Sequence, residues 1–91
     1  MEIKLEKTEN GGVFYIEQDG KRVAFMNFSS SPGRMIISHT DVSDALRGKN
    51  AGKQLVAASV DYARKNNIEI IPLCPFARSV FDRVKEYADV L

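Results

Sequence analysis

Arg47-Gly48-Lys49-Asn50-Ala51-Gly52 lies where the sequence changes from one periodicity to another. Before this segment, short runs of alternating polar and apolar residues are typical of β-strands. After it, apolar residues recur at the spacing of an α-helix, to about Asn66. The segment therefore predicts a strand-to-helix junction, where unpaired backbone N–H groups and the positive end of the helix dipole can hold an anion.

Four strands are expected before the junction, and we place them at residues 2–7, 13–17, 23–28 and 34–39. Asn10-Gly11-Gly12 is expected to turn the chain, and Asp19-Gly20 predicts a type I′ hairpin turn. The serine-rich residues 29–33 are expected to form a loop. Because both alternating sets of the third strand are largely apolar, we expect this strand to be covered on both faces.

One long helix, one short strand and a second helix are expected from the junction onward. Apolar residues predict the first helix over residues 48–66, and Ile68-Glu69-Ile70-Ile71 predicts a strand that ends at Pro72. A strand that returns after a helix favours parallel pairing with the fourth strand. Pro75 suits the first position of the second helix. The order ββββαβα predicts an α/β (α+β) fold with a mixed sheet of about five strands and two helices.

Composition limits the classes of function. The chain has 91 residues, which predicts a single domain over residues 1–91. Its 13 basic and 12 acidic side chains give a net charge of +1, which argues against nucleic-acid or membrane binding through a global field. One Cys and one His exclude a disulfide framework and the usual zinc ligand sets, so we expect no metal. No apolar stretch resembles a signal peptide or membrane span, and a cytoplasmic location is expected.

The junction segment carries a local positive charge. Arg47, Lys49 and Lys53 lie within seven residues, and the Arg47 guanidinium suits phosphate oxygens. The spacing is not that of a P-loop, because Gly48 and Gly52 enclose three residues rather than four. An ordinary glycine-rich helix start with solvated lysines is the alternative interpretation.

The pattern Arg-x-x-Asn-x-Gly from Arg47 to Gly52 resembles the (Gln/Arg)-x-x-Gly-x-(Gly/Ala) loop of the GCN5-related N-acetyltransferases, which hold the pyrophosphate of coenzyme A. Asn50 replaces the middle glycine, and asparagine is the next residue to tolerate left-handed geometry. His39-Thr40-Asp41-Val42 and Pro72-Leu73-Cys74-Pro75-Phe76 also resemble the small, single-domain branch of this superfamily. The resemblance implies a minimal acetyltransferase fold that binds acetyl-CoA or coenzyme A and acetylates an amine.

The resemblance also implies where the site lies. In the acetyltransferase fold, the strand before the loop and the strand after the long helix splay apart around the thioester arm. The cofactor-binding residues that it implies here are Ser38, Thr40, Arg47, Gly48, Lys49, Asn50, Ala51, Gly52, Lys53, Cys74 and Phe76.

His39 and Cys74 are the candidate catalytic residues. His39 is expected to act as general base, directly or through water, while a backbone N–H of the fourth strand faces the carbonyl. The alternative is a histidine that only bonds to backbone at a strand end. Cys74 could accept the acetyl group, protonate the leaving thiolate, or pack as a buried apolar side chain. Tyr87 could reach the thioester region, although closing the small core is its expected role.

The acceptor is not identified by the sequence. Larger members of the superfamily place helices between their first two strands, whereas only residues 8–12 join those strands here. The acceptor pocket is therefore expected to be shallow, completed by another subunit of a homo-oligomer, or replaced by the surface of a macromolecule. The acceptor is expected to be an amine on a small molecule or a protein. Two other functions remain open: a non-catalytic acyl-CoA-binding or sensing module, and a small protein-interaction domain without a ligand.

Overall fold

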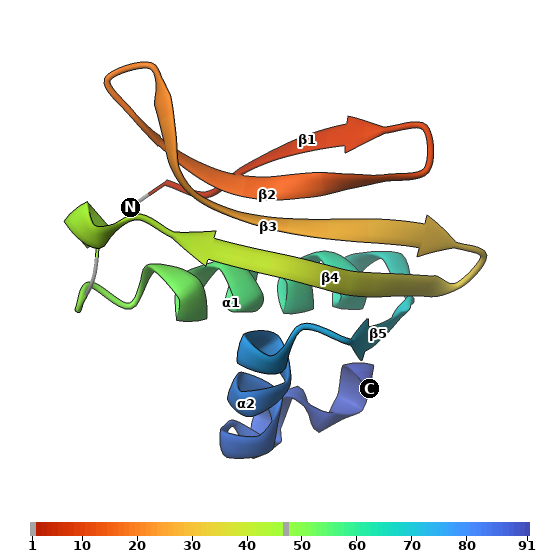
Figure 1. Cartoon of the computed structure of the whole chain (residues 1–91). Coiled ribbons are helices and arrows are strands. Elements are labelled where there is room, and N and C mark those ends of the chain that lie inside the picture. The colour runs from red at the N-terminus through yellow and green to blue at the C-terminus, as the bar shows by residue number, and fades with distance from the viewer. Residues whose placement is uncertain (1, 47) are drawn as a thin grey trace.

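The computed structural model describes residues 2–46 and 48–91 (Figure 1). Arg47, a predicted cofactor-binding residue, lies outside the described residues. The strands are β1 (Lys4–Thr8), β2 (Gly11–Gln18), β3 (Lys21–Ser31), β4 (Arg34–Val42) and β5 (Glu69–Pro72). The α-helices are α1 (Ala51–Asn66) and α2 (Pro75–Arg83), and two 3₁₀ helices, η1 (Asp44–Leu46) and η2 (Lys85–Val90), complete the described elements. The predicted order ββββαβα is confirmed, and only the two 3₁₀ helices were not predicted.

The strands form a single mixed sheet in sequence order, β1-β2-β3-β4-β5. The first four strands are antiparallel, and β5 runs parallel to β4 after the crossover through α1, as predicted. Asp19 and Gly20 have φ values of 51° and 77°, which is the pair of positive angles that a type I′ turn requires. The hairpin prediction is therefore confirmed.

Two of the predicted turns were wrong in their bounds. Gly11 and Gly12 belong to β2 rather than to a turn. A Cβ at Gly11 would collide with the Phe28 carbonyl of β3, and a Cβ at Gly12 would lie 2.8 Å from the Phe28 ring. These glycines serve close strand approach rather than a turn. The serines also belong to the sheet, since β3 continues to Ser31 and the turn itself is Pro32-Gly33.

Both α-helices lie on the same side of the sheet and contact each other (Figure 1). The buried residues of the central strands, such as Phe14, Met26 and Met35, face α1 and α2. The prediction that the third strand is covered on both faces was wrong. Val23 and Phe25 point to the opposite face and are only half-buried, because no described element packs there. The sheet therefore has one open face.

Candidate active site

The parallel pair β4–β5 splits at the level of Ile37. Their pairing ends with Ile37 opposite Pro72, and the N–H groups of Leu73 and Cys74 both donate to the Ile37 carbonyl, at 3.0 and 3.1 Å. Beyond this point β4 continues to Val42, while the chain after β5 turns into α2. In the described part of the chain, β4 residues 38–42 thus have a strand neighbour, β3, on one side only.

A β-bulge at Ser38 sets the direction of the side chains beyond the split. Asn27 of β3 pairs with His39, but the next residue, Phe28, pairs with Ile37, so Ser38 is the extra residue on β4. The Ser38 hydroxyl donates to the Asn27 carbonyl at 3.3 Å. Without the bulge, His39 would share the helix-covered face with Ile37. With it, His39 points to the open face and Thr40 points toward the helices.

Thr40 and Cys74 are brought together across the split. The Cys74 thiol donates to the Thr40 hydroxyl oxygen at a sulfur–oxygen distance of 3.5 Å. Cys74 is buried, with 6% of its surface exposed, and it is the N-cap of α2 with an extended backbone, as its position before Pro75 predicts. His39 is instead exposed, and its ring centroid lies 5.9 Å from that of Phe25. The two candidate catalytic side chains therefore lie on opposite faces of the sheet.

The pKa of Cys74 is shifted downward. Burial of the thiol raises this pKa, but hydrogen bonds with the backbone of Ala77, the hydroxyl of Thr40 and the backbones of Phe76 and Thr40 together outweigh burial, so the net pKa lies below the ordinary cysteine value. The same surroundings that bury the thiol thus make it a better proton donor.

The segment before α1 has the geometry of an anion-binding helix start. Gly48 and Asn50 have positive φ values of 81° and 59°, so Asn50 does adopt the left-handed conformation of the glycine that it replaces. The first bond of α1 runs from the Gln54 N–H to the Asn50 carbonyl at 3.0 Å. The N–H groups of residues 51–53 therefore have no acceptor within the helix, and the first turn contains no acidic residue.

A cavity of about 230 Å³ opens at this helix start. It is lined by Val42, Leu46, Gly48, Asn50, Ala51, Gly52, Lys53 and Phe76. Six of these were predicted as cofactor-binding residues, but Val42 and Leu46 were missed. Leu46 is 1% exposed. Its position as an isolated leucine within a polar stretch was the sequence signal that could have indicated its burial. Lys49 does not line the cavity, and its backbone N–H donates to the Leu46 carbonyl at 3.1 Å.

Gly52 has a packing role that the sequence did not reveal. An ideal Cβ at this position would lie 2.5 Å from the nearest atom of the Phe76 ring. The ring of α2 thus closes over the start of α1, although it keeps 38% of its surface exposed at the cavity. Glycine at this position thus leaves room for an aromatic ring.

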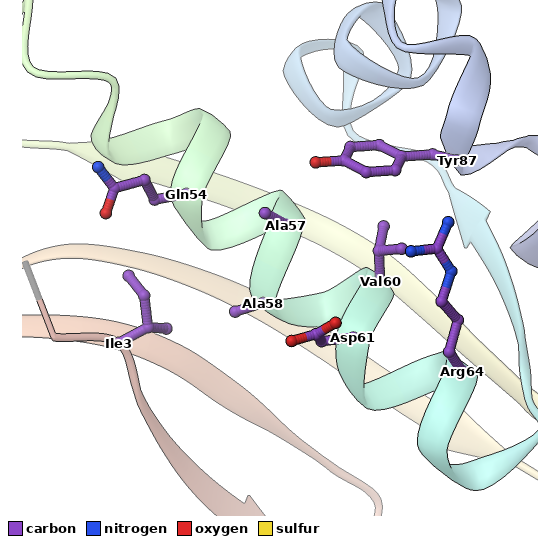
Figure 2. Close-up of a pocket in the computed structure, with 8 residues that line it drawn as sticks. All are labelled: Ile3, Gln54, Ala57, Ala58, Val60, Asp61, Arg64 and Tyr87. Carbon is purple, nitrogen blue, oxygen red and sulfur yellow. The ribbon is translucent and has the colours of Figure 1, made fainter.

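A second cavity, of about 390 Å³, lies over the outer face of α1 and shares no lining residue with the first (Figure 2). Figure 2 shows Ile3 and Tyr87 on opposite sides of α1. The Tyr87 ring packs edge-on against Phe81 at 5.8 Å and stands near Arg64, which pairs with Asp89 at 2.8 Å. Tyr87, a residue of η2, therefore packs against the core and does not line the cavity at the start of α1.

Within residues 2–46 and 48–91, no three His, Cys, Asp or Glu side chains gather in a way that would hold a metal ion. None of the helices in these residues is long and apolar enough to cross a lipid bilayer.

The fold and the site define a class of protein. It has a mixed five-stranded sheet whose parallel strand pair splits, and a helix whose first N–H groups have no acceptor within the helix. The chain belongs to the GCN5-related N-acetyltransferase family, whose model matches residues 13–90.

Solved structures agree with this assignment. A Staphylococcus aureus protein assigned as a GCN5-like N-acetyltransferase is 35% identical, with a TM-score of 0.75 over 96% of this chain and 85% of that chain. A ribosomal-protein-alanine N-acetyltransferase from Brucella melitensis shares the fold at 19% identity, with a TM-score of 0.69 over 85% of this chain and 62% of that chain.

A Bacillus anthracis structure assigned as a streptothricin acetyltransferase, solved with acetyl coenzyme A, shares the fold at 18% identity. Its TM-score is 0.58 over 71% of this chain and 38% of that chain. A comparison with curated protein sequences gave no match.

Proposed function

We propose that this protein transfers the acetyl group of acetyl-CoA to an amine. The observation that carries the proposal is the split between β4 and β5, across which Thr40 contacts Cys74. Family membership supports acyl transfer to an amine in general. The geometry of these residues supports the choice of donor and the roles proposed below.

The start of α1 fits the diphosphate of coenzyme A. The N–H groups of residues 51–53, which have no acceptor within α1, and the side chain of Lys53 supply donors and positive charge. The cavity there is lined by Val42 and Phe76, which suit the apolar part of a pantetheine arm. The unpaired edge of β4 from Ser38 onward supplies backbone groups along the path of the arm. Acetyl-CoA, when bound, supplies the acetyl group as a thioester.

In this proposal one proton transfer takes place on each face of β4. On the open face, His39 takes a proton from the attacking amine, directly or through water. On the helix side, the Cys74 thiol gives its proton to the leaving thiolate, which its lowered pKa favours. The new bond joins the amine nitrogen to the acetyl carbon, the bond from that carbon to sulfur breaks, and Cys74 recovers its proton from solvent. A backbone N–H of β4 beyond Ile37 faces the carbonyl oxygen.

Calorimetric titration with coenzyme A and acetyl-CoA, followed by an assay of free thiol released in the presence of amines, tests the function. Lys53→Glu should weaken coenzyme A binding, because it reverses a charge at the helix start. Lys65→Glu is the matched control, since Lys65 is exposed on the last turn of the same helix. Equal losses in the two variants would contradict the placement of the diphosphate. Saturable binding without thiol release from any amine would favour a sensing module instead.

Intact-mass spectrometry tests the role of Cys74. A proton donor acquires no acetyl group, so the mass of the protein should stay unchanged after mixing with acetyl-CoA. Cys74→Ser should still bind acetyl-CoA but release thiol more slowly, because a serine hydroxyl is a weaker acid. A stable acetyl adduct that disappears in Cys74→Ser would show covalent catalysis and contradict the assignment.

A further inference from the structure

The open face of the sheet, opposite α1 and α2, carries one cluster beside the split. Phe25 and Asp41 are direct cross-strand partners, and Asn27 and His39 are the next pair on the same face. The Phe25 and His39 rings lie 5.9 Å apart between centroids. Asp41 follows His39 by two residues on one strand, which places their Cα atoms about 6.5 Å apart. A half-buried aromatic ring, an imidazole and a carboxylate thus surround one point of this face.

Asp41 places a carboxylate beside these two rings. Four other charged side chains of the open face form pairs: Lys4 pairs with Glu17 at 3.4 Å, and Arg22 pairs with Glu6 at 3.0 Å while its guanidinium covers the Tyr15 ring. Asp41 is exposed, and among the described residues no cation lies within ion-pair distance of it. The cluster therefore attracts a cation to the side of β4 on which His39 acts.

The apolar side chains beside this cluster limit the kind of molecule that carries the cation. Half-buried Ile36 and Ile71 are partners on the open face across β4 and β5, and Leu73, 63% exposed, follows them beside the split. An apolar strip beside an exposed carboxylate suits a polypeptide, which can present apolar side chains and a cationic side chain together.

We propose that the acceptor is a lysine side chain of a polypeptide that docks on the open face, with its methylene stem against Phe25 and its ammonium drawn to Asp41. The ammonium gives its first proton to solvent, and His39, which lies next to this position, takes the second from the attacking amine. This inference rests on the proposed function, because it takes the acetyl group to lie in the split. It adds Phe25 and Asp41 as residues that determine specificity.

Steady-state kinetics with three acceptors tests the proposal: a blocked Gly-Lys-Gly peptide, spermidine, and p-anisidine, which is uncharged near neutral pH. Asp41→Asn should raise KM for the peptide by about two- to fivefold, which is the effect of an exposed ion pair, and leave kcat nearly unchanged. KM for p-anisidine should not change. The difference should vanish in about 1 M salt, where the screening length is only about 3 Å.

Glu69→Gln is the matched control, because Glu69 is an exposed acid on the same face but at the far end of β5. Equal changes of KM in Glu69→Gln and Asp41→Asn would overturn the docking proposal. So would a kcat/KM for spermidine more than about tenfold above that for the peptide, since the acceptor would then be a free polyamine. Calorimetry with acetyl-CoA distinguishes failure of the docking proposal from failure of the proposed function. An absence of saturable heat from the unmutated protein would overturn the proposed function itself.

Discussion

Substitution of Gly52 by alanine tests how the start of α1 meets α2. The added Cβ would lie 2.5 Å from one carbon of the Phe76 ring and 2.7 Å from another. Carbon atoms in ordinary contact are about 3.5–4.0 Å apart, so the ring must retreat by about 1 Å. Because Phe76 is already 38% exposed, the ring can turn outward rather than force the two helices apart.

Two opposing contributions set the change in the free energy of unfolding. Full burial of a phenylalanine side chain contributes about 1.5–3 kcal/mol, and displacing a ring that is partly buried costs about 1–2 kcal/mol of this. Replacing glycine by alanine in a helix gains about 0.5–1 kcal/mol. We therefore expect Gly52→Ala to lower the free energy of unfolding by about 0.5–1 kcal/mol.

A double-mutant cycle in urea isolates the contact. In a Phe76→Ala background the ring is absent, so Gly52→Ala should there raise the free energy of unfolding by about 0.5–1 kcal/mol. The sign of the substitution should thus reverse between backgrounds. An equal gain in both backgrounds would refute the packing of Phe76 on Gly52. Calorimetry on the single variant should also show weaker coenzyme A binding, because the displaced ring lines the cavity.

Three further outcomes are expected. Met26→Ala, at a fully buried position facing α1, should lower the free energy of unfolding by about 2–5 kcal/mol in a denaturant titration. Thr40→Val removes a hydroxyl that lowers the pKa of Cys74, so ultraviolet thiolate absorbance should appear at higher pH than in the unmutated protein. Arg64 lowers the pKa of Asp89 below the ordinary value of 3.8, and the stability from this pair is present above that value and lost as the pH falls below it. Unfolding measured against pH should consequently lose less stability in Asp89→Asn than in the unmutated protein.

The sequence predicted the order of the elements because the local signals agreed with the tertiary structure. Asp19-Gly20 has the geometry that its residue types favour, and Pro75 begins α2. The signals failed where one residue type serves two purposes. Glycine permits both turns and close strand approach, and only the position of the Phe28 carbonyl, from a distant part of the chain, shows that Gly11 serves the second.

Side-chain periodicity misjudged the third strand for a related reason. Val23 and Phe25 have the composition of a strand that is buried on both faces, yet the described helices cover only one. Apolar residues on a strand indicate that its face is covered from water. They do not indicate whether a helix of the same chain or another molecule covers it. The prediction assumed cover by a helix of the same chain. In the docking that we propose, an acceptor polypeptide covers this face instead.

The division of the site between two faces follows from one residue that periodicity cannot identify. Strict alternation from Ile37 would place His39 on the helix side with Cys74, and the sequence-based expectation that both serve the same acyl group depends only on their position along the chain. The bulge at Ser38 turns His39 outward and leaves Thr40 to bond Cys74. A bulge requires no particular residue on the bulged strand, so its position cannot be read from the sequence. The Ser38 hydroxyl at this bulge donates to the Asn27 carbonyl, eleven residues away in the chain. His39 and Cys74 therefore lie on opposite faces of the sheet because the register of β3 against β4 changes at this point.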